Sequence, residues 1–316
     1  MEAVSKEKSL PWLREEISRL KKEKNALIMA HYYQREEIQE IADFIGDSLA
    51  LARQAAKTDA AIIVMCGVHF MGETAKILCP DKKVLIPDKN AGCSLADSCD
   101  PEEFKEFVEA NPDHTVISYV NTSAAVKALT DIVVTSGNAR QIVEKLPEDE
   151  KIIFGPDHNL GEYINSVTGR DMLLWKGACH VHDRFSLERI LEMKKEHPGA
   201  KILVHPECKR PLQLIADKVG STAALLDFAQ KDDAKEYIVV TESGILFEMR
   251  KKCPQKIFLA APAENAECQC NECDFMKMNT LQKVYECLRD ESPEVIVDAE
   301  VAEKAVKPIQ RMLELS

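Results

Sequence analysis

Short runs of aliphatic and β-branched residues alternate along this chain with longer stretches in which apolar residues recur every three or four positions. The clearest short runs are Ile62 to Met65, Ile152 to Phe154 and Ile238 to Thr241. Runs of this length and composition are typical of buried strands, and the longer stretches between them are typical of amphipathic helices. Strands that alternate with helices predict an α/β fold with short parallel sheets.

The order of these elements repeats three times. Each repeat begins with a strand that ends in polar residues, continues through a helix start rich in Gly, Ser and Thr, and finishes in a loop with a cysteine. The strands are in LIMAHYYQ, TVISYVNT and KILVHPEC, the helix starts in GDSLALAR, TSGNARQ and GSTAALL, and the loops in KVLIPDKNAGC, DMLLWKGACHVH and KIFLAAPAENAECQCNEC. A fixed order at a nearly constant period indicates three copies of one structural unit.

The spacing within the repeats supports the same interpretation. Intervals of 17, 17 and 16 residues separate the pairs His31 and Ser48, Tyr119 and Ser136, and His205 and Ser221. From these serines, 45, 43 and 52 residues lead to Cys93, Cys179 and Cys273. Agreement at several landmarks favours a true repeat over coincidence.

We therefore predict three Rossmann-like domains of three αβα layers, related by a pseudo-threefold axis, with short parallel sheets around a central active site. The first domain covers residues 1–108 with an N-terminal amphipathic helix, the second 109–194, and the third 195–316 with a C-terminal helix. The polar landmarks follow strands directly, and ligands of parallel sheets bind at that edge. Three such edges that face one centre would form one cavity.

The serines Ser48, Ser136 and Ser221 stand where helices are predicted to open. A helix start carries unpaired backbone N–H groups, so a hydroxyl there either caps the helix or helps to bind an anion. Taken singly, each serine is an ordinary cap. Three at equivalent places favour a site for anionic ligands.

Composition narrows the classes of function. The 316 residues are 45% hydrophobic and carry a formal charge of −12, which argues against a nucleic-acid partner because phosphate backbones are bound by clustered Lys and Arg. The charged start of the chain lacks the apolar centre of a signal peptide, and the apolar runs are too short to span a bilayer. We expect a cytoplasmic protein without a membrane role.

The 11 cysteines are an odd number, and without an export signal a disulfide scaffold is not expected. Cys66, Cys79 and Cys287 lie in apolar stretches, where a thiol packs as a small hydrophobic group. The remaining question concerns the cysteines that end each repeat.

Three converging thiolates, from Cys93, Cys179 and Cys273, suit a [4Fe–4S] cluster with one iron that has no protein ligand. A zinc site is the alternative, since His182 follows Cys179 in a C-x-x-H pair and would supply a fourth ligand. In the third repeat Cys268 and Cys270 are further candidates.

The chain resembles the quinolinate synthase family over nearly its whole length. The motifs that carry the resemblance are, in order, AHYYQ, GDSLALA, VHFMGETAKIL, AGCSLADSC, SYVNTSAAVKA, VTSGNA, GPDHNLG, WKGACHVH, VHPEC, VGSTAALL, TESGI and CDFMKMNTL. The resemblance implies three α/β domains and a [4Fe–4S] cluster held by Cys93, Cys179 and Cys273. The C-x-C-x-x-C spacing departs from the family pattern, so Cys268 and Cys270 have no assigned role.

The resemblance also implies an activity, the condensation of iminoaspartate with dihydroxyacetone phosphate to quinolinate in NAD biosynthesis, and coupling to an L-aspartate oxidase or dehydrogenase that supplies iminoaspartate. The family's active-site residues fall on His31, Tyr33, Ser48, Tyr119, Asn121, Ser136, His182, His205, Glu207 and Thr222. The open iron would act as a Lewis acid. Another cluster-dependent hydro-lyase and an electron carrier are the competing classes.

Among these residues we expect Glu207 to be the general base, with His205, Tyr33 and His31 as its catalytic partners. A carboxylate in a dry pocket is expected to have a raised pKa, which would make it a competent base near neutrality. We expect His182 to hydrogen-bond to substrate and not to ligate the open iron.

Overall fold

The structure is a computed structural model that describes residues 8–264 and 271–316. Within these residues the strands form three parallel sheets of four strands each, in the orders β2-β1-β3-β4, β6-β5-β7-β8 and β10-β9-β11-β12. The first sheet contains β1 (Ala26–His31), β2 (Phe44–Gly46), β3 (Ile62–Cys66) and β4 (Lys83–Leu85). The second contains β5 (Thr115–Tyr119), β6 (Ile132–Val134), β7 (Ile152–Gly155) and β8 (Leu173–Leu174). The third contains β9 (Lys201–Val204), β10 (Lys218–Val219), β11 (Glu236–Val240) and β12 (Ile257–Ala260).

Helices connect the strands of each sheet in the same order. Those of the first repeat are α2 (Glu36–Ile41), α3 (Ser48–Lys57), α4 (His69–Leu78) and α5 (Ser94–Asp97). The second repeat has α6 (Pro101–Glu109), α7 (Ala124–Lys127), α8 (Ala139–Glu144), α9 (His158–Thr168) and α10 (His180–Asp183). The third has α11 (Leu187–Glu196), α12 (Arg210–Leu214), α13 (Thr222–Lys231), α14 (Ile245–Lys252) and α15 (Asp274–Lys277). The predicted α/β class and the three-sheet arrangement are confirmed.

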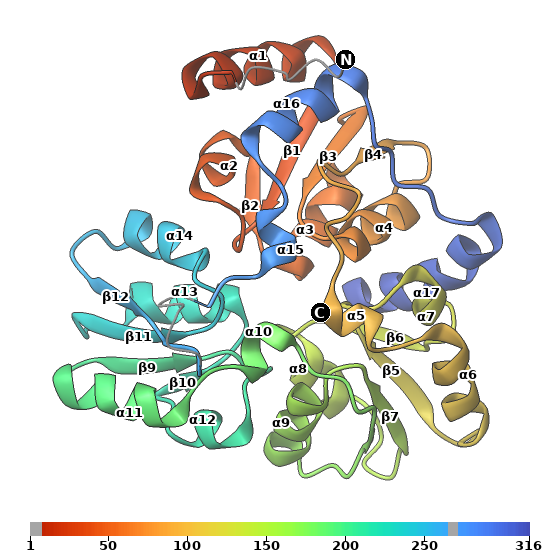
Figure 1. Cartoon of the computed structure of the whole chain (residues 1–316). Helices are drawn as coiled ribbons and strands as arrows, with labels where there is room; N and C mark the ends of the chain where they lie inside the picture. The colour runs from red at the N-terminus through yellow and green to blue at the C-terminus, as the bar shows by residue number, and fades with distance from the viewer. Residues whose placement is uncertain (1–7, 265–270) are drawn as a thin grey trace.

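The three sheets lie around a common centre, with α5, α10 and α15 near it (Figure 1). Three further helices, α1 (Leu10–Glu23), α16 (Leu281–Asp290) and α17 (Ala299–Leu315), lie toward the chain ends. Buried apolar residues of α1 and α16 share one cluster with the first sheet, while α17 packs against β6, α7 and α4. The C-terminal helices therefore tie the first and second sheets together, and the division at residues 108 and 194 stays a proposal. No helix in the described part of the chain has the length and apolar character needed to cross a membrane.

An aspartate fixes the second strand of each sheet to the first in the same way. Its backbone N–H donates to a carbonyl of the first strand at 2.9 Å, and its Oδ2 accepts the N–H of that same residue at 2.8 Å. The pairs are Asp43 with Ile28, Asp131 with Val116, and Asp217 with Ile202. Identical contacts at three places confirm that the repeat read from the sequence is structural.

One of the predicted helix starts requires a correction. α8 begins at Ala139, so Ser136 does not open it, because the Asn138 side chain turns back to accept the N–H of Thr135 and closes a turn before the helix. The Ser221 hydroxyl caps α13 through the N–H of Ala224, as the ordinary interpretation expects.

The landmark chosen in the third repeat, Ser221, is wrong by one residue, although the strand register is the same in all three repeats. The strand partner of His31 is Gly46 and that of Tyr119 is Val134, and β10 pairs Val219 with Val204, the residue before His205. Gly220 therefore stands level with His205. The true equivalent of Ser48 and Ser136 is Thr222, which follows His205 by 17 residues as in the other repeats.

The aspartate contacts predict a stability effect. Replacing Asp131 by Ala removes the acceptor for the Val116 N–H, and we expect the free energy of unfolding to fall by about 1–2 kcal/mol. Chemical denaturation of the variant measures this. Asp149→Ala, at an exposed aspartate in the loop before β7, should change it by less than about 0.5 kcal/mol. Equal losses in the two variants would contradict the role given to Asp131.

Candidate active site

One pocket lies where the carboxyl-terminal edges of the three sheets meet. Its volume is about 690 Å³, including the open mouth. It is lined by all thirteen residues to which the family resemblance assigns the cluster and the active site: His31, Tyr33, Ser48, Cys93, Tyr119, Asn121, Ser136, Cys179, His182, His205, Glu207, Thr222 and Cys273. The structure thus brings these thirteen residues to one place, while their roles stay predictions. Ser221, the further anion-binding candidate, does not line the pocket.

The lining follows the pseudo-threefold pattern in layers. The strands β1 and β5 end at His31 and Tyr119, and His205 directly follows β9. Two residues further along the chain are Tyr33, Asn121 and Glu207, and beyond the second strands are Ser48, Ser136 and Thr222. Equivalent backbone positions therefore carry different chemical groups, so a symmetric scaffold surrounds an asymmetric ligand site.

Each cysteine loop is attached to its own sheet by an equivalent backbone hydrogen bond. The residue three positions after the end of β3, β7 or β11 donates its backbone N–H to the carbonyl of the residue two positions before the cysteine. The pairs are His69 to Ala91 at 2.7 Å, His158 to Gly177 at 2.8 Å and Ser243 to Asn271 at 3.3 Å. The loops thus hold Cys93, Cys179 and Cys273 at the sheet edges.

The three thiols have similar surroundings. Each cysteine stands at the N-cap position of a short helix, α5, α10 or α15. Burial raises the pKa of Cys93 to about 12 and that of Cys273 to about 11, and it raises the pKa of Cys179 well above its usual value. Backbone N–H groups of the following helical turn act in the opposite direction, since they hydrogen-bond to the sulfur. Such sulfurs keep their protons until a metal ion replaces them.

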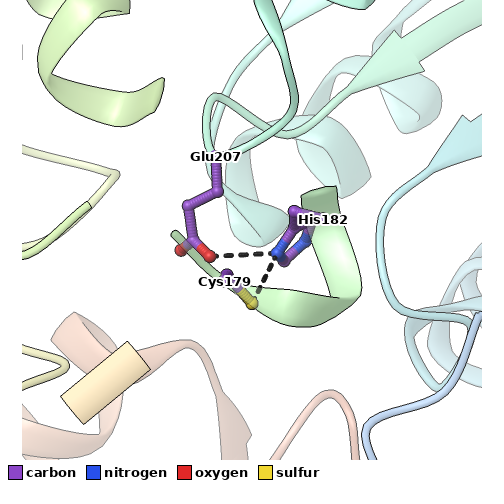
Figure 2. Close-up of side chains that lie close together, drawn as sticks. All are labelled: Cys179, His182 and Glu207. Carbon is purple, nitrogen blue, oxygen red and sulfur yellow. Dashed lines mark hydrogen bonds and ion pairs between the residues drawn. The ribbon is translucent and has the colours of Figure 1, made fainter. Parts of the chain in front are cut away.

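Cys179, His182 and Glu207 form the group among the described residues whose ligand atoms, all within 4.8 Å of one another, could hold a metal ion. Figure 2 shows one nitrogen of the His182 ring facing both the Cys179 sulfur and the Glu207 carboxylate. His182 Nδ1 lies 2.9 Å from Glu207 Oε2 and 3.3 Å from Cys179 Sγ. The His205 ring stacks on the His182 ring, with 4.5 Å between their centroids.

A hydrogen-bond chain leads from this group to Tyr33. His182 Nε2 lies 2.9 Å from Thr241 Oγ1, and the Tyr33 hydroxyl is 2.7 Å from Thr241 Oγ1 and also 2.7 Å from Thr222 Oγ1. The Tyr119 hydroxyl donates to Glu207 Oε1. Burial raises the pKa of both tyrosines well above the usual value, so they remain protonated donors.

Comparison with known proteins gives one consistent result. Residues 15–314 match the family described as Quinolinate synthetase A protein. The chain belongs to this family. It is 54% identical to the quinolinate synthase of Chloroherpeton thalassium over 302 residues, which are 96% of this chain and 94% of that protein. It is 55% identical to the quinolinate synthases of Microcystis aeruginosa and Synechocystis sp. over 300 residues, 95% of this chain and 94% of each relative.

The electrostatics of this family member correct one expectation. Glu207 was expected to have a raised pKa in its dry pocket, and burial does favour the protonated acid. His182, His205 and the Tyr119 hydroxyl outweigh burial and lower the pKa of Glu207 to about 2. The expectation is wrong because the sequence did not show that both carboxylate oxygens would have partners.

His31 and His205 lie entirely within the pocket wall, and burial lowers the pKa of each to about 3. Both rings are therefore neutral at physiological pH. A neutral imidazole can donate one hydrogen bond and accept another, which suits a polar ligand.

Sequence reasoning missed three residues of this site. Thr241 joins His182 to Tyr33, the Asn159 amide donates to the Glu207 backbone carbonyl at 3.1 Å, and Asp157 lies buried beneath Cys179. Thr241 and Asp157 follow the third strands of their sheets, β11 and β7, and that position is the signal that could have revealed them.

Other cysteines agree with their expected roles. Cys66, Cys79 and Cys287 are buried free thiols, as the apolar context predicted. Cys268 and Cys270 lie outside the described residues.

The neutral histidines predict a pH effect on stability. Because the pKa of His205 is about 3 when folded and about 6.5 when unfolded, the unfolded chain binds more protons between these values. The free energy of unfolding should therefore fall as pH falls below 6.5, by up to about 1.4 kcal/mol per pH unit for this histidine. In His205→Gln protein prepared without metal, denaturation curves between pH 6.5 and 5 should show a smaller fall. His158→Gln, at a half-exposed histidine, is the control, and an unchanged slope in His205→Gln would contradict the argument.

Proposed function

We propose that this chain is a quinolinate synthase that condenses iminoaspartate with dihydroxyacetone phosphate to quinolinate, with release of phosphate and water, in NAD biosynthesis. The observation that carries the proposal is one pocket in a member of this family that gathers a cysteine from each repeat with His, Tyr, Asn and Glu side chains. The cytoplasm is the proposed location, where an L-aspartate oxidase or dehydrogenase would supply the unstable imine.

The cofactor we propose is a [4Fe–4S] cluster held by Cys93, Cys179 and Cys273. The donor set fits, because three sulfurs line one pocket and each faces the N–H groups of a helix start, which stabilise a thiolate. Three cysteine ligands leave one iron without a protein ligand, and when bound the cluster supplies a Lewis acid for the loss of water.

The substrates are anions, and the pocket offers neutral donors for them. Ser48, Ser136 and Thr222 contribute hydroxyls around the pocket wall. The buried amide oxygen of Asn121 has no hydrogen-bond partner among the described residues, so a bound ligand would satisfy it. Uncharged donors bind carboxylates and phosphate without the long-range attraction of a basic patch, which is consistent with a chain of net charge −12.

Glu207 is the proposed base for proton removal from carbon. Its carboxylate is ionised at physiological pH, and Tyr119 and His182 fix the orientation of its two oxygens. The hydrogen bonds that orient Glu207 continue from His182 through Thr241 to the Tyr33 hydroxyl.

A single zinc ion at Cys179, His182 and Glu207 is the second candidate, favoured by the proximity of their ligand atoms. Hydrogen bonds already account for that proximity, because His182 Nδ1 lies at 2.9 Å from Glu207 Oε2. The zinc site would also leave Cys93 and Cys273 without a role. Metal analysis of protein purified and reconstituted without oxygen separates the two candidates.

The cluster ligands can be tested singly. Cys93→Ala, Cys179→Ala and Cys273→Ala should each lose most of the bound iron and sulfide together with activity, because each removes one of three protein ligands. Anaerobic iron and sulfide assays with a visible spectrum measure this. Cys66→Ala and Cys287→Ala should keep the cluster and cost only packing, on the order of 1 kcal/mol. Full iron content in any of the first three variants would refute the assignment.

Glu207→Gln tests the base. The amide keeps the shape of the side chain but cannot accept the substrate proton, so turnover should fall by about 100-fold or more while the iron content stays at the parental value. Steady-state assays of quinolinate formation, paired with iron analysis, measure both quantities. Near-normal turnover would refute the role, and a loss of iron would assign Glu207 to the metal site instead.

A further inference from the structure

Two of the three cysteine loops rest on a buried carboxylate that plays no part in the chemistry proposed above. Asp157 and Glu242 are both fully buried. Asp157 lies two residues after the end of β7, and Glu242 lies two residues after the end of β11. Burying a carboxylate is costly unless its oxygens have partners, so the contacts of these two indicate what they are for.

The two oxygens of Asp157 serve different elements. Oδ1 accepts the N–H of Leu160 at 2.7 Å and thereby caps α9, and Oδ2 accepts the N–H of Cys179 at 3.1 Å. Asp157 therefore joins the first turn of a helix of the second sheet to the backbone of a candidate cluster ligand.

Glu242 makes the equivalent connection in the third repeat. Oε2 accepts the N–H of Gly244 at 2.7 Å, and Oε1 accepts the N–H of Cys273 at 3.2 Å. The Lys277 ammonium lies 3.0 Å from Oε1 and donates to the backbone carbonyl of Tyr33 at 2.8 Å. This carboxylate thus connects the Cys273 loop to the loop that carries Tyr33 in the first repeat.

The first repeat differs at this position. Val68 occupies the place of Asp157 and Glu242, and a valine side chain cannot accept a hydrogen bond. All three loops share the backbone attachment to their sheets, so the carboxylates are an addition found under Cys179 and Cys273 alone among the three cysteines. A contact that served only the fold would be expected in all three repeats.

We propose that Asp157 and Glu242 are positioning residues that orient Cys179 and Cys273 toward the cluster. This inference rests on the cluster assignment under the proposed function. Both oxygens of each carboxylate accept backbone N–H groups, so an amide side chain, with one acceptor oxygen and an NH₂ group, satisfies one of the two N–H groups and opposes the other. Asp157→Asn and Glu242→Gln therefore keep the shape of the side chain but lose one of its two hydrogen bonds to backbone N–H groups.

The test uses the full chain reconstituted with iron and sulfide without oxygen. We expect Asp157→Asn and Glu242→Gln to release iron to an excess of a ferrous chelator about tenfold faster than the parental protein. We also expect the midpoint potential of the cluster to differ from the parental value, because it depends on the hydrogen bonds and charges around the ligating sulfurs. Asp298→Asn and Asp298→Ala, at the cap of α17 outside the pocket, are matched controls for a changed helix cap.

The outcomes distinguish a failure of the positioning role from a failure of the cluster assignment. Faster iron release and a changed potential in both pocket variants, with parental behaviour in the Asp298 controls, support the positioning role. Parental release rates and potentials in Asp157→Asn and Glu242→Gln overturn it and leave the cluster assignment intact. Failure of the parental protein to bind iron and sulfide overturns both.

Discussion

Everything in this structure depends on one geometric constraint, which is that three parallel sheets must turn the same edge toward a common centre. In a parallel sheet all carboxyl ends lie on one edge, so each sheet delivers its polar strand ends together. One sheet presents His31 and Tyr33, another Tyr119 and Asn121, and the last Glu207. A pocket built from three edges can enclose a ligand more completely than one edge alone.

The packing of three sheet edges around one centre also shields the side chains at that centre from water. Glu207 and His182 are almost fully buried, and they stay in that environment because every polar atom of the pair has a partner. The same burial keeps the tyrosines protonated and the other histidines neutral. Enclosure therefore sets the protonation state of the pocket as well as its shape.

The fold could be predicted from the sequence because each repeat is marked by local sequence features. Strand runs, helix starts and the aspartates of the ADF, TDI and ADK segments recur at fixed spacing, and each copy folds through short-range contacts. The wrong helix start at Ser136 arose because an Asn turn competes with the first turn of the helix. The one-residue error at Ser221 arose because the adjacent residue Thr222 also carries a hydroxyl.

The sequence by itself determined the three repeats, the three cysteines and the set of polar residues that line the pocket. Only the tertiary structure decided which of them touch. Glu207 contacts both Tyr119 and His182, Thr241 joins His182 to Tyr33, and Asp157 lies beneath Cys179. All of these are contacts between segments far apart in the chain. Such contacts fix pKa values and hydrogen-bond partners, and the local pattern of residues does not encode them because they depend on how three sheets pack against one another.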